Sequence, residues 1–234
     1  MEQNLYFDSS WNKIAISISG GADSALLSYL ICKNITDQEL HFINHIRCWK
    51  TKPWQKDDAD RVLDWFRNRF PQISQHVHRN FIPPEMEWAD KGPTMMDEYG
   101  KKVSGDNIEI RAFSEYICYK NNIDAYYNAV TKNPSETSFS GMPTRDLEKT
   151  NKNKHLEYMT HLGKEVIHPF RFIEKNQIIK EYKKHGILDL LELTRSCEGI
   201  FSTITYENYD PNLPVPVCGE CFWCKEREWA IDNS

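Results

Sequence analysis

The first constraint on the fold is an alternating run of isoleucines that ends at a glycine pair. Isoleucine occupies every second position from 14 to 18, a period of two that is typical of a strand. Gly20-Gly21 ends this pattern, and beyond Ser24 the apolar residues have helical spacing, at 26, 27, 30 and 31. The stretch therefore predicts a strand, a glycine turn and a helix, which is the repeating unit of parallel α/β sheets.

The rest of the chain continues this alternation. Further strands are predicted at 40–46, 73–78, 125–130 and 166–169, and further helices at 61–70, 107–119, 174–185 and just after Cys221. Gly186 stands where a helix C-terminus needs a left-handed residue. A loop is predicted at 81–105, and 132–145 is polar and rich in turns. We expect a Rossmann-like, doubly wound parallel sheet of about five strands, with residues 1–195 as the nucleotide-binding domain and 196–234 as a small extension.

Composition narrows the function classes. The chain has 234 residues, which is long enough for a core without disulfides, and no run approaches the roughly 20 apolar residues of a membrane span. The net charge of −5 provides no global basic field for nucleic acid, so a small-molecule substrate is expected. The first ten residues lack an apolar export signal, which favours the cytoplasm. A homodimer is compatible with the sequence.

The turn after the first strand has the chemistry of a phosphate site. It reads Ser19-Gly20-Gly21-Ala22-Asp23-Ser24. Glycines allow close approach of a ligand, and the N–H groups at a helix N-terminus attract phosphate. The two serine hydroxyls can also donate to phosphate oxygens. Asp23 would act through Mg²⁺ or by bracing the loop, since a carboxylate repels phosphate directly. An ordinary serine–glycine turn is the alternative.

Four of the seven cysteines have metal-ligand spacing. Cys218, Cys221 and Cys224 form C-x2-C-x2-C, and Cys197 precedes them by about 20 residues. Four thiolates suit a closed, tetrahedral, structural Zn²⁺ site, which would supply folding energy to the proline-rich tail. An iron–sulfur cluster and a redox pair remain the alternatives. The other three cysteines are not expected to act together; Cys32 and Cys118 are predicted to be small buried hydrophobes.

The motif Ser-Gly-Gly-x-Asp-Ser resembles the pyrophosphate loop of the N-type ATP pyrophosphatases, the PP-loop family. Together with Cys197 and the C-terminal C-G-x-C-x-x-C-x-x-R pattern, it is similar to the 7-cyano-7-deazaguanine synthase (QueC) family. His168-Pro169-Phe170 and 173–179 also resemble a segment of that family. The resemblance implies cleavage of ATP between the α and β phosphates and an adenylate intermediate.

For this chain, the resemblance implies adenylation of 7-carboxy-7-deazaguanine, attack by ammonia, and dehydration of the amide to the nitrile preQ0. It assigns pyrophosphate binding to Ser19, Gly20, Gly21, Asp23 and Ser24. It also makes Asp23, Ser24 and Lys175 candidate catalytic residues, with Lys175 offering a positive charge to the leaving group. A solvated helix lysine is the alternative for Lys175. No glutaminase segment is visible, so ammonia would arrive free or from another protein.

The substrate-facing segments depart from the family pattern. They read His45-Ile46-Arg47-Cys48-Trp49, Ser104-Gly105-Asp106-Asn107 and 140–146. ATP chemistry is therefore better supported than the substrate. Alternatives are adenylation of another carboxylate, an enzyme that stops at the amide, a tRNA-modifying enzyme, and a non-catalytic nucleotide- or zinc-binding module. His41, His76 and His78 lie in or beside predicted strands and are expected to be hydrogen-bonded structural histidines, not ligands.

Overall fold

The computed structural model describes residues 5–48, 53–83, 94–96, 102–134, 156–159, 164–199, 201, 204, 208–213 and 215–234. For 94–96, 102–106, 156–159 and 164–165 it describes the backbone alone.

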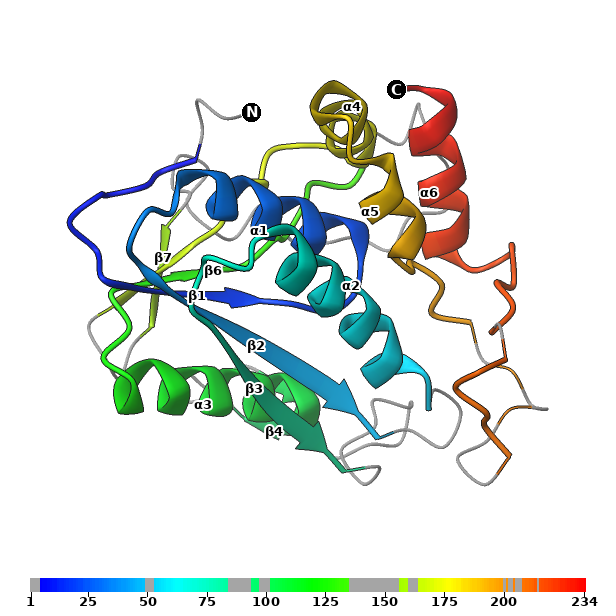
Figure 1. Ribbon diagram of the computed structural model, residues 1–234. Helices are drawn as coiled ribbons and strands as arrows, with labels where there is room; N and C mark the ends of the chain where they lie inside the picture. Colours follow the sequence, from blue (N-terminus) through cyan, green and yellow to red (C-terminus); the bar gives the residue numbers. More distant parts are fainter. Residues whose placement is uncertain are drawn as a thin grey trace.

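A six-stranded sheet forms the centre of the molecule (Figure 1). Five strands run parallel, in the order β3 (Gln75–Ile82), β2 (Glu39–Arg47), β1 (Lys13–Ser17), β6 (Ala125–Tyr127) and β8 (Lys164–Ile167). The edge strand β7 (Leu156–Met159) pairs antiparallel with β8. The predicted doubly wound parallel α/β sheet is thus confirmed, with one antiparallel edge strand added.

Helices cover both faces of this sheet. One face carries α1 (Ala22–Asn34), α2 (Gln55–Arg69), α4 (Lys175–His185), α5 (Leu188–Leu193) and α6 (Phe222–Asp232), whose apolar residues share one core with β1 and β2. The other face carries α3 (Gly105–Lys120), which packs Ile117 and Cys118 on Ile43 and Tyr126. Two layers of helix therefore enclose the sheet.

Helix α1 is the innermost helix because it is apolar on all sides. Ten of its thirteen residues are buried, from Ala22 to Cys32. It starts at the carboxyl end of β1, and β1 is the strand at which the order reverses: β2 and β3 lie on one side of it and β6 and β8 on the other. Ligands of open α/β sheets bind in the crevice at such a switch point. The topology therefore places the glycine turn at the expected binding edge.

Several sequence predictions need correction. β7 and α5 were not predicted, because four- and six-residue elements leave too short a periodic pattern. α2 begins at Gln55, six residues before the predicted start, and the predicted loop at 81–105 contains the antiparallel hairpin β4 (Thr94–Met96) and β5 (Lys102–Ser104). Of the predicted polar segment at 132–145, the residues from 135 onward lie outside the described part of the chain.

The helix ends follow local chemistry. Glu174 and Gln177 form a capping box at the start of α4, and Gly186 ends this helix with φ of 64°, as the sequence predicts. None of the helices described here has the length and apolar character needed to cross a bilayer.

Candidate active site and metal centre

The serine hydroxyls hold the β1–α1 turn in shape. Ser24 Oγ donates a hydrogen bond to the Gly21 carbonyl (3.1 Å) and accepts one from the Ser19 N–H (3.2 Å). Ser19 Oγ lies 3.2 Å from Ser24 Oγ and accepts from the Gly21 N–H (3.3 Å). All six predicted loop residues, 19–24, therefore lie in one closed turn at the N-terminus of α1, where phosphate would meet backbone N–H groups.

Gly20 is required by both conformation and space. Its φ is +79°, and a Cβ at this position would lie 2.7 Å from the carbonyl carbon of Asp58 and 2.8 Å from the Ala59 nitrogen. The loop thus packs directly against the backbone near the start of α2. Any side chain at Gly20 would push the loop and this helix apart.

Lys175 belongs to the loop, although it lies about 150 residues away in sequence. Its Nζ donates to Asp23 Oδ2 at 2.5 Å, and the residue is only 6% exposed, so it is not a solvated helix lysine. The other carboxylate oxygen, Asp23 Oδ1, is buried and accepts no hydrogen bond from the described part of the chain. Tyr182 Oη, also on α4, donates to the Ala22 carbonyl (2.7 Å). Helix α4 therefore supplies the positive charge beside the turn.

The loop faces a hollow of about 200 Å³. Besides Ser19, Gly21, Ala22, Asp23 and Lys175, its walls include residues that the sequence did not single out as site residues: Arg195, Ser196, Glu198, Trp223 and Glu226. Two cations and three carboxylates thus surround a space suited to a phosphate group and a hard divalent cation. The sequence holds no local signal for this set, because its members meet only through the fold.

Arg195 connects the loop to the C-terminal tail. Its backbone N–H donates to the Gly20 carbonyl (3.0 Å), and its guanidinium donates to the carbonyls of Val215 (2.9 Å) and Pro216 (2.7 Å). The guanidinium also lies over the Trp54 ring, 5.2 Å from its centroid. We call residues 194–199 the strap, since this segment joins the phosphate loop to the cysteine cluster.

The four predicted cysteine ligands do meet. The sulfur atoms of Cys197, Cys218, Cys221 and Cys224 all lie within 4.8 Å of one another. Cys218 Sγ is 3.6 Å from Cys197 Sγ and 3.9 Å from Cys224 Sγ. Four thiolates on a tetrahedral Zn²⁺, with bonds of about 2.3 Å, lie roughly 3.8 Å apart. The arrangement fits a single metal ion.

Backbone N–H groups donate hydrogen bonds to two of the four sulfur atoms, whereas burial raises the pKa of Cys224. Backbone N–H groups of Gly199 and Cys218 donate to Cys197 Sγ, each at 3.4 Å, and that of Cys221 donates to Cys218 Sγ at 3.3 Å. The Cys221 N–H is the main reason that the pKa of Cys218 is lowered to about 6. A Cβ on Gly199 would lie 2.8 Å from Cys218 Sγ, so glycine is needed beside the cluster. Cys32 and Cys118 are buried elsewhere, as predicted.

Of the divergent substrate-facing segments, the structure describes mainly the first. His45 Nε2 lies 3.1 Å from Ser114 Oγ, which in turn lies 3.2 Å from the hydroxyl of the buried Tyr126. Asn80 Nδ2 is 3.3 Å from the other ring nitrogen. Burial, and to a lesser degree Arg47, lowers the pKa of His45 to about 4, so its ring is neutral at pH 7. Residues 140–146 lie outside the described part of the chain.

Comparison with solved structures identifies proteins of similar fold. The structure is similar to U34-tRNA thiolase NcsA from Methanococcus maripaludis with its [4Fe-4S] cluster. The similarity covers 99% of this chain and 68% of the thiolase chain, with 14% identity and a TM-score of 0.50. Phosphoadenylyl-sulfate reductase from Candida auris, in a phosphate complex, matches 88% of each chain with 12% identity and a TM-score of 0.44. NMN synthetase from Francisella tularensis gives 17% identity over 85% of this chain and 71% of that one (TM-score 0.45). No family model and no curated protein matches the sequence.

At 14% identity, the likeness to the thiolase supports the Rossmann-like α/β fold and no particular activity.

The close packing of the loop on α2 can be tested with two glycines. Gly20→Ala should lower the free energy of unfolding by more than the roughly 1 kcal/mol of an alanine in the left-handed region, because the new Cβ also meets the Asp58 backbone. Gly186→Ala is the matched control, since Gly186 has φ of +64° but no atom within 4 Å of its Cβ position. Urea denaturation measures both; equal losses would contradict the packing argument.

Loss of the cysteine cluster should loosen the strap and with it the phosphate loop. In Cys218→Ser, we expect faster amide hydrogen exchange at Arg195, because its hydrogen bond to Gly20 is only two residues from Cys197. Cys48→Ser is the control, because Cys48 lies outside the cluster. Exchange mass spectrometry of peptides covering 190–200 and 39–47 measures the effect. Unchanged exchange at Arg195 in Cys218→Ser would show that the two sites are independent.

Proposed function

We propose that this chain is an ATP-dependent carbon–nitrogen ligase of the 7-cyano-7-deazaguanine synthase type, which adenylates a small-molecule carboxylate. The observation that carries this proposal is the buried Lys175–Asp23 pair beside the Ser19–Ser24 turn. An ordinary serine–glycine turn does not need a lysine from a distant helix. A phosphate loop does, because the leaving pyrophosphate carries negative charge that must be stabilised.

The residues of the turn would bind the β and γ phosphates of ATP. Backbone N–H groups at the start of α1 and the hydroxyls of Ser19 and Ser24 are the donors, and the helix dipole adds to their attraction. Lys175 would shift its Nζ from Asp23 toward the phosphates or serve both. Because Lys175 is buried, its charge acts on the pyrophosphate with less screening than at the surface.

The carboxylates that line the hollow are suited to binding Mg²⁺. Among the residues with a described position, none donates a hydrogen bond to the buried Asp23 Oδ1, and Glu198 and Glu226 line the same hollow. Hard oxygen ligands of this kind are those that Mg²⁺ takes beside phosphates. When bound, the ion would neutralise phosphate charge during the transfer. Asp23 would hold it on the loop side.

The reaction then proceeds by two substitutions. A substrate carboxylate oxygen attacks the α phosphorus of ATP, and pyrophosphate leaves toward Lys175. Ammonia next attacks the acyl carbon of the adenylate and AMP leaves, giving an amide. In the QueC-type reaction this amide of 7-carboxy-7-deazaguanine is then dehydrated to the nitrile. AMP is a far better leaving group than the hydroxide that would leave from the free acid.

For the tail we propose structural zinc. The sulfur spacing fits one ion, and in an iron–sulfur cluster the thiolates bind different irons and lie farther apart. Zinc bound by Cys197, Cys218, Cys221 and Cys224 leaves no open position for substrate. Its contribution would be to hold the strap, and through it Gly20, in place.

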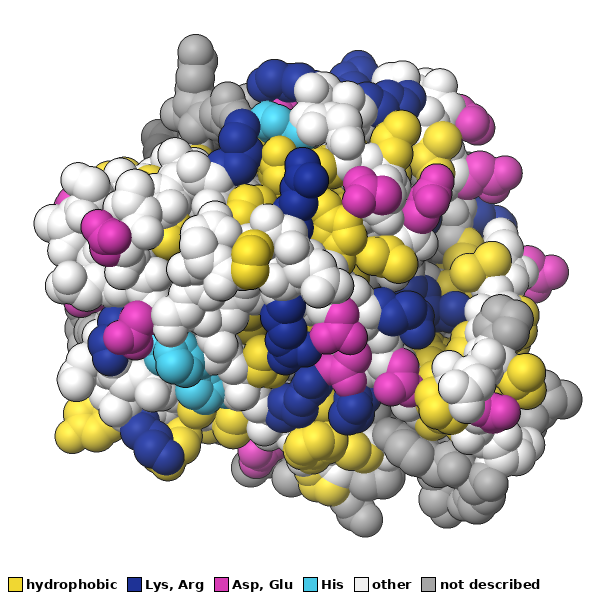
Figure 2. All heavy atoms as spheres, in the orientation of Figure 1, with side chains coloured by type: hydrophobic (Ala, Val, Ile, Leu, Met, Phe, Trp, Pro, Cys, Tyr) yellow, Lys and Arg dark blue, Asp and Glu magenta, His cyan; other side chains and the backbone are white. Residues whose placement is uncertain are grey.

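A second candidate is modification of tRNA. It is favoured by the similarity in fold to a U34-tRNA thiolase over 99% of this chain. The charge distribution gives it less support. The net charge is −5, and the face in Figure 2 has basic and acidic side chains interspersed. On α2, Lys56 pairs with Asp60 and Arg67 pairs with Asp64. We therefore rank a small-molecule carboxylate first. A cytoplasmic enzyme that takes free ammonia, alone or as a homodimer, is the corresponding proposal for location and partners.

An AMP-release assay tests this ranking. Purified protein with ATP and Mg²⁺ should form AMP and pyrophosphate when given 7-carboxy-7-deazaguanine and ammonium, with the amide or nitrile found by mass spectrometry. Bulk tRNA with a sulfide donor is the parallel arm. AMP that forms with tRNA and not with the deazapurine would overturn the ligase proposal in favour of tRNA modification.

Substitution of Lys175 tests the site itself. Lys175→Met should lower kcat for AMP formation by about 100-fold or more, which is the usual effect of losing one strong electrostatic contact to a developing charge. Lys180→Met is the matched control, because Lys180 lies on the same helix but is exposed. Normal kcat in Lys175→Met would remove the lysine from the mechanism.

Asp23→Asn, with Asp37→Asn as an exposed control, should raise the Mg²⁺ concentration needed for half-maximal rate.

A further inference from the structure

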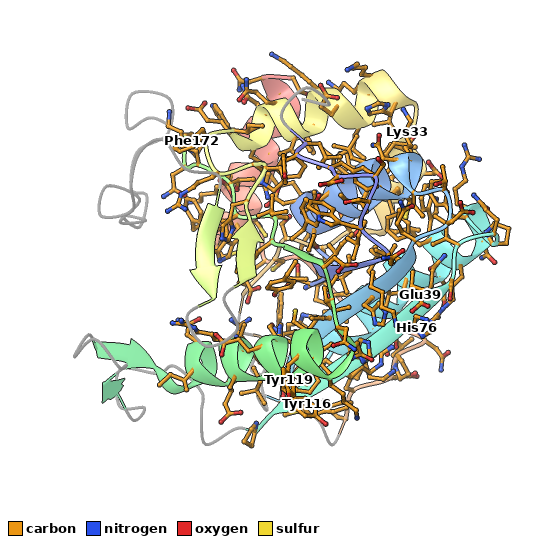
Figure 3. All side chains as sticks on the ribbon, turned by 90° about the vertical axis from the view of Figure 1, so that its left-hand side faces the viewer. Lys33, Glu39, His76, Tyr116, Tyr119 and Phe172 are labelled. Atoms are coloured by element: carbon orange, nitrogen blue, oxygen red, sulfur yellow. The ribbon has the colours of Figure 1, made fainter. Side chains whose placement is uncertain are left out.

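A histidine cluster lies at the edge of the sheet opposite to the phosphate loop. His41 pairs in register with His76 across β2 and β3, and Glu39 and His78 lie two residues away on these strands. Side chains two residues apart point to the same face of a sheet, so all four share the face covered by α3. Figure 3 labels Glu39 and His76, which lie next to each other near the start of their strands.

His41 is the buried member of this cluster. It is 3% exposed, and its Nδ1 lies 2.9 Å from His78 Nε2. Its other ring nitrogen, Nε2, is buried and has no hydrogen-bond partner among the residues that the structure describes, and Glu39 Oε2 lies 3.5 Å away. The sequence predicts hydrogen-bonded structural histidines here, but that interpretation does not account for His41 Nε2. A buried polar atom without a partner is costly and calls for a ligand.

Three potential ligand atoms surround the same point. One ring nitrogen of His41, one of His76 and a carboxylate oxygen of Glu39 all lie within 4.8 Å of one another. The Glu39 oxygen is 3.5 Å from His41 Nε2 and 3.8 Å from His76 Nε2. Around a tetrahedral ion with bonds of about 2.0–2.1 Å, ligand atoms lie roughly 3.3 Å apart. The His76 and Glu39 side chains are exposed, which leaves them room to rotate toward an ion.

We propose that His41, His76 and Glu39 bind a divalent transition-metal ion of the Zn²⁺ or Ni²⁺ class, with water at the remaining positions. Two imidazoles and one carboxylate are ligands typical of these ions. This site is separate from the cysteine cluster in sequence and in ligand chemistry, and it does not depend on the proposed ligase activity.

The hydrogen bond to His78 is compatible with the tautomer that a metal ligand needs. If His41 Nδ1–H donates to His78 Nε2, then His41 Nε2 carries a lone pair in the plane of its ring, with Glu39 Oε2 3.5 Å away. The His76 ring stacks on that of His41, with 4.7 Å between the centroids and 24° between the planes, so the His76 side chain has to rotate to direct Nε2 at the same ion. His78 is then the outer partner that orients the buried ligand.

Two neighbours compete with a metal ion, and they provide useful controls. Lys13 Nζ lies 3.3 Å from Glu39 Oε2, so its positive charge competes with a metal ion for the carboxylate. Ser74 Oγ lies 3.2 Å from His76 Nε2 and can donate a hydrogen bond to it. Removing either neighbour should leave the ligands freer for the ion. Their loss should strengthen binding, or at least leave it unchanged, whereas loss of a ligand should weaken it.

The test is calorimetric titration of the untagged full chain with NiCl₂, with release of zinc followed by a colorimetric dye. We expect the wild type to bind one Ni²⁺ per chain without release of zinc. His76→Ala and Glu39→Gln should weaken this binding by about 100-fold or more, since loss of even an outer-shell partner costs 10–100-fold. His76 is chosen because its side chain is 46% exposed, which favours a folded variant; thermal melts verify this.

The neighbours supply the matched controls. Ser74→Ala should bind Ni²⁺ at least as tightly as the wild type, and Lys13→Met should bind it several times more tightly. Wild-type affinity in folded His76→Ala and Glu39→Gln would overturn the proposal, as would the absence of binding by the wild type up to millimolar Ni²⁺. Binding that releases zinc in equal amount and survives both substitutions would assign the nickel to the cysteine cluster and also overturn it.

Discussion

The contact of Gly20 with its neighbours is the constraint on which the candidate active site depends. Its left-handed backbone turns the chain from β1 into α1, and the absence of a Cβ lets the backbone of α2 approach. Its carbonyl accepts a hydrogen bond from the Arg195 N–H, so the strap is also attached at this glycine. Three segments that are distant in sequence therefore meet at one glycine. Displacing any of them would move the N–H groups that point toward a phosphate.

This arrangement explains why a phosphate-binding turn and a cysteine cluster occur in one chain. The tail after the strap is held in two ways: Arg195 donates to the carbonyls of Val215 and Pro216, and α6 buries Ala230 in the common core. Arg227 on α6 completes the connection by donating to the Thr194 and Leu191 carbonyls. A metal at the cysteines would therefore stabilise the tail and the loop together. The cluster need not touch substrate to influence catalysis.

How far the sequence predicts this structure depends on the range of the interactions. The turn at 19–24 and the end of α4 at Gly186 follow from local backbone chemistry and are visible in the residues themselves. The cysteine set is also visible, because metal ligands have characteristic spacing. By contrast, Lys175, Arg195 and Glu226 reach the loop only through the fold, so periodicity carries no signal for their convergence. β7 and α5 were missed because they are too short for a pattern.

Strand β2 runs from the histidine cluster to the carboxyl edge of the sheet. Glu39 and His41 stand near its start and His45 near its end, with His41 and His45 four residues apart, or about 13 Å of extended chain. An ion held between β2 and β3 would stabilise the pairing of these strands at the end where His76 is exposed to solvent. The same pairing positions Asn80 against His45 at the carboxyl edge. The pairing of β2 with β3 therefore extends without interruption from the histidine cluster at one end to His45 at the other.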